Sequence, residues 1–289
     1  MIGSTALGTT RIGATTFAWG TRTYVMGILN VTPDSFSGDG LLQASDAVAG
    51  AVAQALAMVE EGADLLDIGG ESTRPGHAIV DEAEELGRVI PVVRAVRAAL
   101  PATPLTIDTT KPVVALAALE AGADAINDVW GVRREATLAR VAAGRGVPIV
   151  LMHNREAPLY EDLVPEVLAD LRRAVDSSLA AGVLESNILV DPGIGFGKTA
   201  EQNVELLGRL DALQELGRPI LLGTSRKSTL GKILDGLPAE ERLEATLATT
   251  ALGIAAGVDV IRVHDVRANV RAARTADAIV RGGWREGST

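Results

Sequence analysis

The segment with the clearest chemical signal is residues 188–199, which read Ile-Leu-Val-Asp-Pro-Gly-Ile-Gly-Phe-Gly-Lys-Thr. Its apolar beginning is typical of a buried parallel strand that ends at Asp191, because Pro192 cannot extend a sheet. The alternating glycines that follow allow a flat ligand to approach the backbone closely, with the Asp191 carboxylate as a hydrogen-bond acceptor at its edge. On this segment alone, a role of Asp191 in capping the next helix is an equal alternative.

The same segment ends in Gly-Lys-Thr, which is also the ending of a phosphate-binding P-loop. The spacing G-x-x-x-x-G-K-[ST] requires a glycine at position 192, where this chain has Pro192. The sequence therefore excludes a P-loop at this position.

Other polar and charged residues also follow short apolar runs. They are Asn30, Thr73, Arg74, Asp108, Asn127, Asp191, Ser225, Lys227, Arg262 and His264. The two carboxylates and the amide of Asn127 suit the edge of a polar heterocycle. The cations suit an anion such as phosphate, since Arg offers a forked donor and Lys a point charge. In a chain of net charge −10, these cations predict a local anion pocket.

Eight apolar runs are expected to form the strands that deliver these residues. They span residues 24–29, 65–68, 105–107, 125–127, 148–151, 188–190, 220–222 and 260–263. Segments with helical periodicity, such as 44–61 and 81–99, separate them and predict eight helices. A short β-hairpin is expected ahead of them at about residues 11–23.

A repeated joint supports this alternation of helices and strands. The sequences Glu-Gly-Ala-Asp at 61–64, Ala-Gly-Ala-Asp at 121–124 and Ala-Gly-Val-Asp at 256–259 each stand between a predicted helix and a predicted strand. A glycine just past a helix takes the left-handed conformation that ends it. Eight such units predict a single-domain α/β protein over residues 1–289, a (β/α)8 TIM barrel, with a doubly wound open sheet as the alternative. In a barrel, all the polar strand ends lie on one rim, where active sites of this fold are found.

The composition excludes several classes of protein. The chain has 289 residues, of which 47% are hydrophobic and only 3% aromatic, with a net charge of −10. This charge argues against a nucleic-acid surface, and the lack of cysteine excludes disulfides and thiolate metal sites. No apolar run is long enough to span a membrane, and the first ten residues lack the pattern of a signal peptide. We therefore expect a cytoplasmic protein.

Each candidate residue also has a purely structural interpretation. Asp108 and Asn127 could cap the helices that follow them, and His264 could stand at a helix start. Lys111 and Lys198 are expected to be solvated loop charges. Met152 and Phe196 would more often belong to a core than contact a ligand, and His153 would be a loop or hydrogen-bonded histidine. The coincidence of polar residues at so many strand ends favours an enzyme.

Seven segments together resemble the dihydropteroate synthase family, in the family's order and from about residue 24 to residue 282. They are 27–37 (GILNVTPDSFS), 69–76 (GGESTRPG), 108–112 (DTTKP), 126–128 (IND), 191–198 (DPGIGFGK), 223–228 (GTSRKS) and 262–265 (RVHD). The resemblance implies a (β/α)8 barrel. It also implies the condensation of 6-hydroxymethyl-7,8-dihydropterin pyrophosphate with p-aminobenzoate, which gives 7,8-dihydropteroate and pyrophosphate in folate synthesis.

The resemblance also implies a role for each site residue. The pterin would contact Asp108, Asn127, Met152, Asp191, Phe196, Gly223, Lys227 and Arg262, of which Asp108, Asp191, Lys227 and Arg262 would be catalytic. The pyrophosphate would contact Asn30, Thr73, Arg74, Arg262 and His264, and p-aminobenzoate would contact Phe36, Thr73, Pro75, Lys227 and Ser228. Asn30 would ligate Mg²⁺. A homodimer is implied as well.

Such a reaction is consistent with the available side chains. In an ionisation-first form of the reaction that the resemblance implies, pyrophosphate would leave first and the dihydropterin cation would form beside two carboxylates. The amine of p-aminobenzoate would then attack the cation, so no side-chain nucleophile would be needed. One alternative is a pterin-binding methyltransferase domain, which would lack the 225–228 segment and the Arg262–His264 pair. The other alternative is a homologue that binds pterin without turnover.

Overall fold

The computed structural model describes residues 7–31, 44–71, 80–132, 135–282 and 284–285. Its strands form a two-stranded antiparallel hairpin and an eight-stranded parallel sheet. The hairpin consists of β1 (Thr9–Ile12) and β2 (Thr15–Ala18). The parallel strands are β3 (Tyr24–Asn30), β4 (Leu65–Gly69), β5 (Leu105–Asp108), β6 (Ala125–Asp128), β7 (Ile149–Met152), β8 (Ile188–Asp191), β9 (Leu221–Leu222) and β10 (Val260–Val263).

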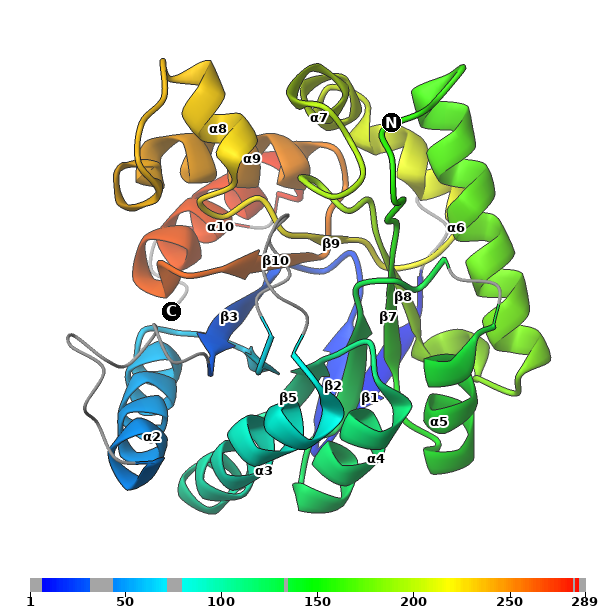
Figure 1. The fold of residues 1–289 in the computed structure, drawn as a ribbon. Coiled ribbons are helices and arrows are strands. Elements are labelled where there is room, and N and C mark those ends of the chain that lie inside the picture. The colour runs from blue at the N-terminus through cyan, green and yellow to red at the C-terminus, as the bar shows by residue number, and fades with distance from the viewer. Residues whose placement is uncertain (1–6, 32–43, 72–79, 133–134, 283, 286–289) are drawn as a thin grey trace.

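The parallel sheet closes into a barrel surrounded by helices (Figure 1). Its strand order is β8-β7-β6-β5-β4-β3-β10-β9, and a parallel bridge between Val190 and Ile220 joins its two ends. The TIM barrel predicted from the sequence is therefore confirmed, and the open-sheet alternative is excluded. The eight predicted strands agree with the observed ones to within a residue or two at each end. The hairpin is also confirmed, although it begins at Thr9 and ends at Ala18.

The helices lie between successive strands. They are α2 (Ala44–Glu60), α3 (Glu82–Ala99), α4 (Pro112–Ala121), α5 (Thr137–Arg145), α6 (Leu163–Ala180), α7 (Ala200–Leu207), α8 (Ser228–Ile233), α9 (Leu243–Ala255) and α10 (Val266–Val280). Short 3-10 helices are η1 (Glu185–Asn187), η2 (Leu210–Leu216) and η3 (Ala239–Glu241). The prediction of eight helices was one too few for the described residues, because both α8 and α9 lie between β9 and β10. Over those residues, no helix has the length and apolar character needed to cross a membrane.

The repeated joints have the backbone conformation that the sequence predicts. Gly62, Gly122 and Gly257 have φ angles of 105°, 119° and 95°. The aspartate that follows each glycine makes a contact that the sequence does not reveal, because it accepts a backbone N–H bond at the start of the neighbouring strand. The Asp64 carboxylate accepts from the Val25 N–H at 2.8 Å. In the same way Asp124 accepts from the Leu105 N–H at 2.9 Å, and Asp259 accepts from the Ile220 N–H at 3.1 Å.

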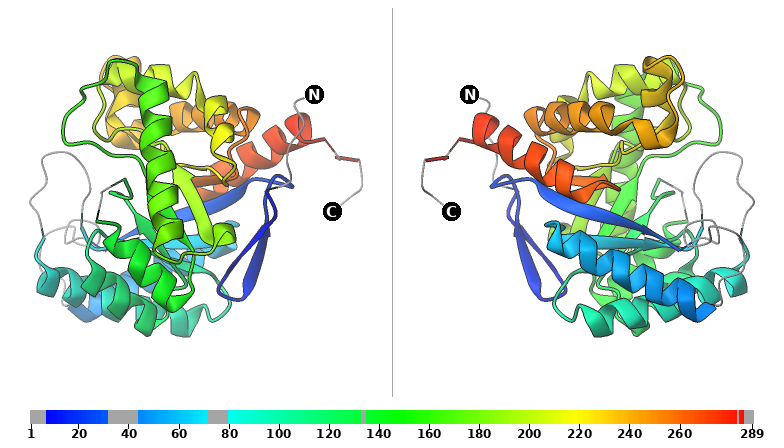
Figure 2. Two further views of the ribbon diagram at one scale, coloured as in Figure 1. Left: turned by 90° about the vertical axis from the view of Figure 1, so that its right-hand side faces the viewer. Right: turned by 90° about the vertical axis from the view of Figure 1, so that its left-hand side faces the viewer.

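The apolar core has two parts. One lies between the strands and the surrounding helices. The other contains alternate residues of the strands together with the hairpin residues Ile12, Phe17 and Trp19. Its strand members include Leu65, Ala125, Val150, Leu189, Leu221 and Val260. Figure 2 shows the blue hairpin at one end of the barrel, beside the start of β3.

Candidate functional site

The candidate site lies at the carboxyl ends of the barrel strands. Alternate residues of a strand share a face, so the residue two positions after an inward-facing core residue also faces the interior of the barrel. The inward-facing core residues are Leu65, Ala125, Val150, Leu189, Leu221 and Val260. The residues two positions after them are Asp67, Asn127, Met152, Asp191, Gly223 and Arg262. Strand register sets Asp108 beside Asn127, and Met152 beside Asp191. A polar layer thus lies above an apolar layer inside the barrel.

Arg262 and Asp67 form the centre of a buried hydrogen-bond network. Arg262 Nε donates to Asp67 Oδ2 at 2.6 Å, and its Nη2 donates to Asp108 Oδ2 at 2.8 Å. Asn127 Nδ2 also donates to Asp67 Oδ2 at 2.9 Å, and the Thr106 hydroxyl donates to Asp67 Oδ1. Because Asp67 is fully buried and accepts from three side chains, it fixes the guanidinium and the amide in place.

Asp67 is the site residue that sequence reasoning missed. It stands inside an apolar strand run, two positions after Leu65, which faces the interior of the barrel. A lone carboxylate at such a position signals a buried charge that needs a partner. That signal could have singled out Asp67 from the sequence, but it could not have identified Arg262 as its partner.

Two buried oxygens in this network have no hydrogen-bond partner among the described residues, Asp108 Oδ1 and Asn127 Oδ1. An unpaired buried acceptor costs free energy, so these atoms favour a ligand that brings N–H donors. Burial raises the pKa of Asp108 to about 7, although the charge of Arg262 opposes the shift. Burial likewise raises the pKa of Asp191 to about 6, opposed by the Gly193 N–H that donates to its Oδ1 at 2.7 Å.

Lys227 and Phe196 form one wall beside these acceptors. Lys227 Nζ lies 3.8 Å from the centroid of the Phe196 ring, a cation–π contact. Phe196 is partly exposed, so it is not a core residue, whereas Met152 is buried at the end of β7. A Cβ added at Gly223 would lie 3.9 Å from both Asp191 Oδ2 and Arg262 Cβ, so this glycine borders the same group of side chains.

A second group of residues lies on the loop after β9 and at the end of β10. His264 Nδ1 lies 2.9 Å from Ser225 Oγ, and the His264 backbone N–H donates to the same hydroxyl at 3.1 Å. Ser228 is exposed and is the first residue of α8. Asn30 ends β3, opposite Gly69 of β4, at the same rim. The predicted contacts Phe36, Thr73, Arg74 and Pro75 lie outside the described residues.

Two lysines differ from what the sequence predicted, and both expectations of a solvated charge were wrong. Lys111 Nζ binds Glu71 at 2.5 Å and the fully buried Glu85 at 2.6 Å. Lys198 Nζ binds a histidine nitrogen and two backbone carbonyls. His153 is fully buried and hydrogen-bonded, as one of the two structural interpretations expected.

The arrangement suits a neutral or cationic heterocycle. Its carboxylates and amide accept hydrogen bonds, and Lys227 and Arg262 add positive charge at the edge. Among the described residues, no group of three or more His, Asp or Glu side chains is arranged to hold a metal ion. The chain also has no cysteine to act as a thiolate nucleophile.

Comparison with known families and proteins points to one group. Residues 26–264 match a family described as pterin binding enzyme. The dihydropteroate synthase of Clostridium beijerinckii is 50% identical over 272 residues, which cover 94% of this chain and 99% of that protein. The dihydropteroate synthase of Bacillus subtilis is 49% identical over 262 residues, or 91% of this chain and 90% of that protein.

Solved structures give the same result. A dihydropteroate synthase from Clostridium difficile, crystallised in the presence of pteroic acid, has a TM-score of 0.88 and 48% identity, and the match covers 92% of this chain and 99% of that one. The dihydropteroate synthase of Xanthomonas albilineans in complex with 7,8-dihydropteroate has a TM-score of 0.81 and 44% identity, over 89% of this chain and 94% of that one.

Proposed function

This chain belongs to the pterin-binding enzyme family, and we infer that it is a transferase with dihydropteroate synthase activity in folate biosynthesis. It condenses 6-hydroxymethyl-7,8-dihydropterin pyrophosphate with p-aminobenzoate to give 7,8-dihydropteroate and pyrophosphate. The observation that carries this inference is the polar layer inside the barrel. There, unpaired oxygens of Asp108 and Asn127 lie next to the Arg262 guanidinium.

The pterin is proposed to occupy the space beside these oxygens. Its ring N–H groups would donate to Asp108, Asn127 and Asp191, and Lys227 would donate to a ring acceptor. The ring would lie between the Arg262 guanidinium and the wall formed by Met152 and Phe196, with Gly223 leaving room for it. The three acceptors Asp108, Asn127 and Asp191 are buried, and each has a fixed partner on the protein side, which favours a single orientation of the ring.

The pyrophosphate is proposed to bind at the rim, against Asn30, Thr73, Arg74, Arg262 and His264. The structure supports this for His264, which Ser225 holds in place at 2.9 Å. Arg262 uses Nε and Nη2 for carboxylates, and its Nη1 has no acceptor among the described residues. For p-aminobenzoate we propose a site formed by Phe36, Thr73, Pro75, Lys227 and Ser228, with its carboxylate near the Ser228 hydroxyl.

A magnesium ion fits this arrangement as a companion of the pyrophosphate. Mg²⁺ commonly takes one or two protein oxygens and completes its coordination shell with phosphate and water. The side-chain oxygen of Asn30 offers one such ligand at the rim, so we propose Asn30 as its protein ligand. When bound, the ion would neutralise charge on the leaving group.

We propose an ionisation-first displacement. The carbon–oxygen bond to pyrophosphate breaks, and the pair of electrons leaves with the pyrophosphate. The carboxylates of Asp108 and Asp191 stabilise the dihydropterin cation that remains, since the burial of both groups strengthens this attraction. The amine nitrogen of p-aminobenzoate forms the new carbon–nitrogen bond and loses a proton.

The decisive experiment is to incubate the purified protein with both substrates and Mg²⁺ and to measure pyrophosphate release and dihydropteroate by mass. Release that requires both substrates supports the proposal. Pterin binding without release would identify a homologue without turnover. Methyl transfer to or from a folate, without pyrophosphate release, would identify a methyltransferase domain.

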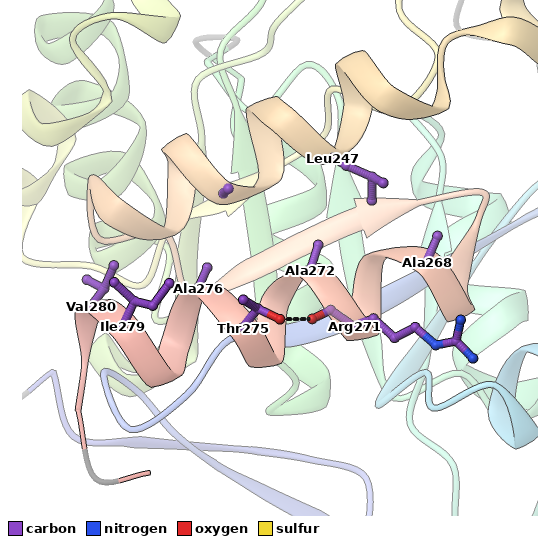
Figure 3. A pocket seen from close by; sticks show the side chains of 9 residues that line it. Leu247, Ala268, Arg271, Ala272, Thr275, Ala276, Ile279 and Val280 are labelled. Carbon is purple, nitrogen blue, oxygen red and sulfur yellow. Dashed lines mark hydrogen bonds between the residues drawn. The ribbon is translucent and has the colours of Figure 1, made fainter.

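A homodimer is proposed on the face formed by α9 and α10. A groove of about 690 Å³ runs between these helices, lined by Leu247, Ala268, Ala272, Ala276 and Ile279 among others (Figure 3). Ile279 is 78% exposed and Val280 is 47% exposed at one end of the groove. Small residues and a large apolar side chain on one face suit a two-fold interface, in which each copy inserts its large side chain into the other's groove.

Light scattering after gel filtration tests the homodimer. Ala272→Arg would fill the groove with a charged side chain, and we expect it to convert a dimer to a folded monomer. Leu159→Asp is the matched control, because Leu159 is 76% exposed but lies in the loop before α6. A monomeric parent protein, or a dimer that survives Ala272→Arg, would contradict this interface. Separately from the dimer, we propose that the protein is located in the cytoplasm.

A further inference from the structure

A cluster of polar side chains lies beneath the loop that follows β8, and the proposed reaction does not use it. Its centre is the ammonium group of Lys198. Nζ lies 2.9 Å from His153 Nδ1 and donates to the carbonyl oxygens of Gly193 and Phe196 at 3.0 and 3.1 Å. An ammonium group has three N–H donors, and here each has one acceptor.

The direction of every hydrogen bond in this cluster follows from that count. When Lys198 is charged, its ammonium group cannot accept, so His153 Nδ1 is the acceptor and the ring proton lies on Nε2. Nε2 is 3.1 Å from Asp170 Oδ2, so it donates to that carboxylate. Asp170 is held in turn by Arg155 Nε at 2.8 Å and by Arg173. Burial lowers the pKa of His153 to about 4, which is consistent with a neutral ring.

The loop held by Lys198 carries two features of the proposed pterin site. The Gly193 N–H donates to Asp191, and Phe196 packs against Lys227. The loop also lies very close to the residues beneath it, since a Cβ at Gly193 would be 1.8 Å from the His153 carbonyl oxygen. Gly193 therefore cannot be replaced without moving the backbone. The buried side chain of Ile194 anchors the loop on one side of this glycine, and the bonds of Lys198 to Gly193 and Phe196 add to that anchor.

We propose that Lys198 is a positioning residue, which acts through Gly193 and Phe196 and is held through His153 by Asp170. It sets the place of the Phe196 ring and of the Gly193 N–H, and so the shape of the pterin site, without touching the pterin. The expected effect of Lys198 on pterin affinity rests on the proposed function. The expected effect of Lys198 on the position of the loop does not depend on that function.

The positive charge of Lys198 contributes to its hold on the loop. Burial lowers the pKa of Lys198 to about 7, and the Asp191 carboxylate opposes the shift. The other charged or titratable groups that face it are Arg155, Lys227, Asp170 and His153. A neutral amine has only two N–H donors for three acceptors, so the hold on the loop weakens as the pH rises through about 7.

The first test compares Lys198→Met with the parent protein. Methionine keeps most of the apolar stem and removes all three donors. We expect amide hydrogen exchange of the ligand-free protein to become faster in the loop of residues 191–199 and to stay unchanged in the barrel strands β3–β7, β9 and β10. The matched control is Lys232→Met, because Lys232 is exposed and lies at the end of α8. Unchanged exchange in residues 191–199 would overturn the proposal.

The second test measures pterin affinity by calorimetry. We expect Lys198→Met to weaken 6-hydroxymethylpterin about tenfold, because the ligand must then order the loop itself. The difference from the parent should shrink above pH 7, and kcat at saturating substrate should change less than KM. Equal affinity in variant and parent would sink the proposal. A parent protein that binds no pterin would instead refute the proposed function, while the exchange result would still stand.

Two variants of His153 separate positioning from simple packing. The amide of asparagine reaches about as far as Nδ1, so His153→Asn keeps an acceptor for Lys198. Glutamine reaches about as far as Nε2, so His153→Gln keeps the bond to Asp170 and removes that acceptor. We expect pterin affinity to be retained better in His153→Asn than in His153→Gln. The reverse order, in two variants of similar thermal stability, would contradict the proposed chain of contacts.

Discussion

At the scale of single residues, the candidate site depends on carboxylates that are kept away from water. Asp108 and Asp191 lie at strand ends, at 6% and 5% exposure, and their pKa values are raised by burial. Asp67 is still more buried, and its carboxylate accepts from both Arg262 and Asn127, which holds the Arg262 guanidinium next to Asp108. The group is therefore pre-arranged to bind donors from a ligand, with no need for movement of its own side chains.

The first prediction concerns Asp191. Asp191→Ala should weaken pterin binding at least about tenfold, because a hydrogen bond to a charged group contributes roughly 1.5–3 kcal/mol. Calorimetric titration with 6-hydroxymethylpterin measures the effect. Asp211→Ala, at an exposed position in η2, is the control and should bind as the parent does. Near-normal affinity in Asp191→Ala would remove Asp191 from the site.

The second prediction concerns pH. In the empty protein the raised pKa values mean that Asp191 and Asp108 become ionised only near pH 6 and 7. Their contribution to folding stability is therefore fully present below about pH 4 and is lost as the pH rises through these values. A ligand that donates N–H bonds prefers the ionised carboxylates, so its affinity should rise between about pH 5 and 7 with release of protons.

Calorimetry in two buffers of different ionisation enthalpy counts the protons released. Asp108→Asn removes the group with the higher pKa and should flatten the upper part of the pH profile. Constant affinity between pH 5 and 7, or uptake of protons on binding, would contradict this account of the two carboxylates.

At the scale of elements, local signals predicted most of the barrel. The apolar runs marked all eight parallel strands, and the glycines at 62, 122 and 257 marked three joints with the left-handed conformation. These features depend on neighbours in sequence. The contacts that were missed join distant residues, such as Asp67 with Arg262 and Lys198 with His153. Sequence patterns show that a buried charge needs a partner, but only the fold determines which residue it meets.

The third prediction follows from the joints at the opposite end of the barrel. Asp124 accepts the Leu105 N–H at 2.9 Å and pairs with Arg97. Asp124→Ala would leave the Leu105 N–H without its acceptor and remove one of several acceptors of Arg97, and we expect it to lower the free energy of unfolding by about 1–3 kcal/mol. Urea unfolding measures this cost. Pterin affinity of the folded variant should be unchanged, because the joint lies away from the site. A loss of affinity without a loss of stability would be evidence against this division between the two ends.

At the scale of the whole molecule, the N-terminal hairpin closes one end of the barrel and the proposed site occupies the other. Phe17 is fully buried, and its ring centroid lies 4.7 Å from that of Tyr24 and 5.5 Å from that of Trp19. The turn of the hairpin also packs against the helix–strand joint at residues 121–124, since a Cβ added at Gly13 would lie 2.8 Å from the Asp124 carboxylate. The hairpin is thus part of the barrel core and excludes water from beneath the polar layer.

The fourth prediction tests the role of the hairpin. Phe17→Ala should lower the free energy of unfolding by about 3–5 kcal/mol, as large-to-small changes of core aromatics do. Leu184→Ala, at a position that is 62% exposed, should have little effect. Chemical unfolding of the two variants gives the comparison. If Phe17→Ala unfolds like the parent, the hairpin is an accessory and not a part of the core.

The two oxygens of Asp108 and Asn127 that have no partner among the described residues have a consequence for the lifetime of the protein in a cell. A donor-bearing ligand that pairs with these oxygens binds the folded protein and not the unfolded chain, so occupied molecules open less often than free ones. Proteases act on opened molecules, and the supply of pterin would then set how much of the enzyme survives. An inhibitor that satisfies the same two oxygens would protect its own target from degradation and raise its abundance. An inhibitor confined to the p-aminobenzoate side would leave these two oxygens unpaired, and it would protect the protein only through the free energy of its own binding.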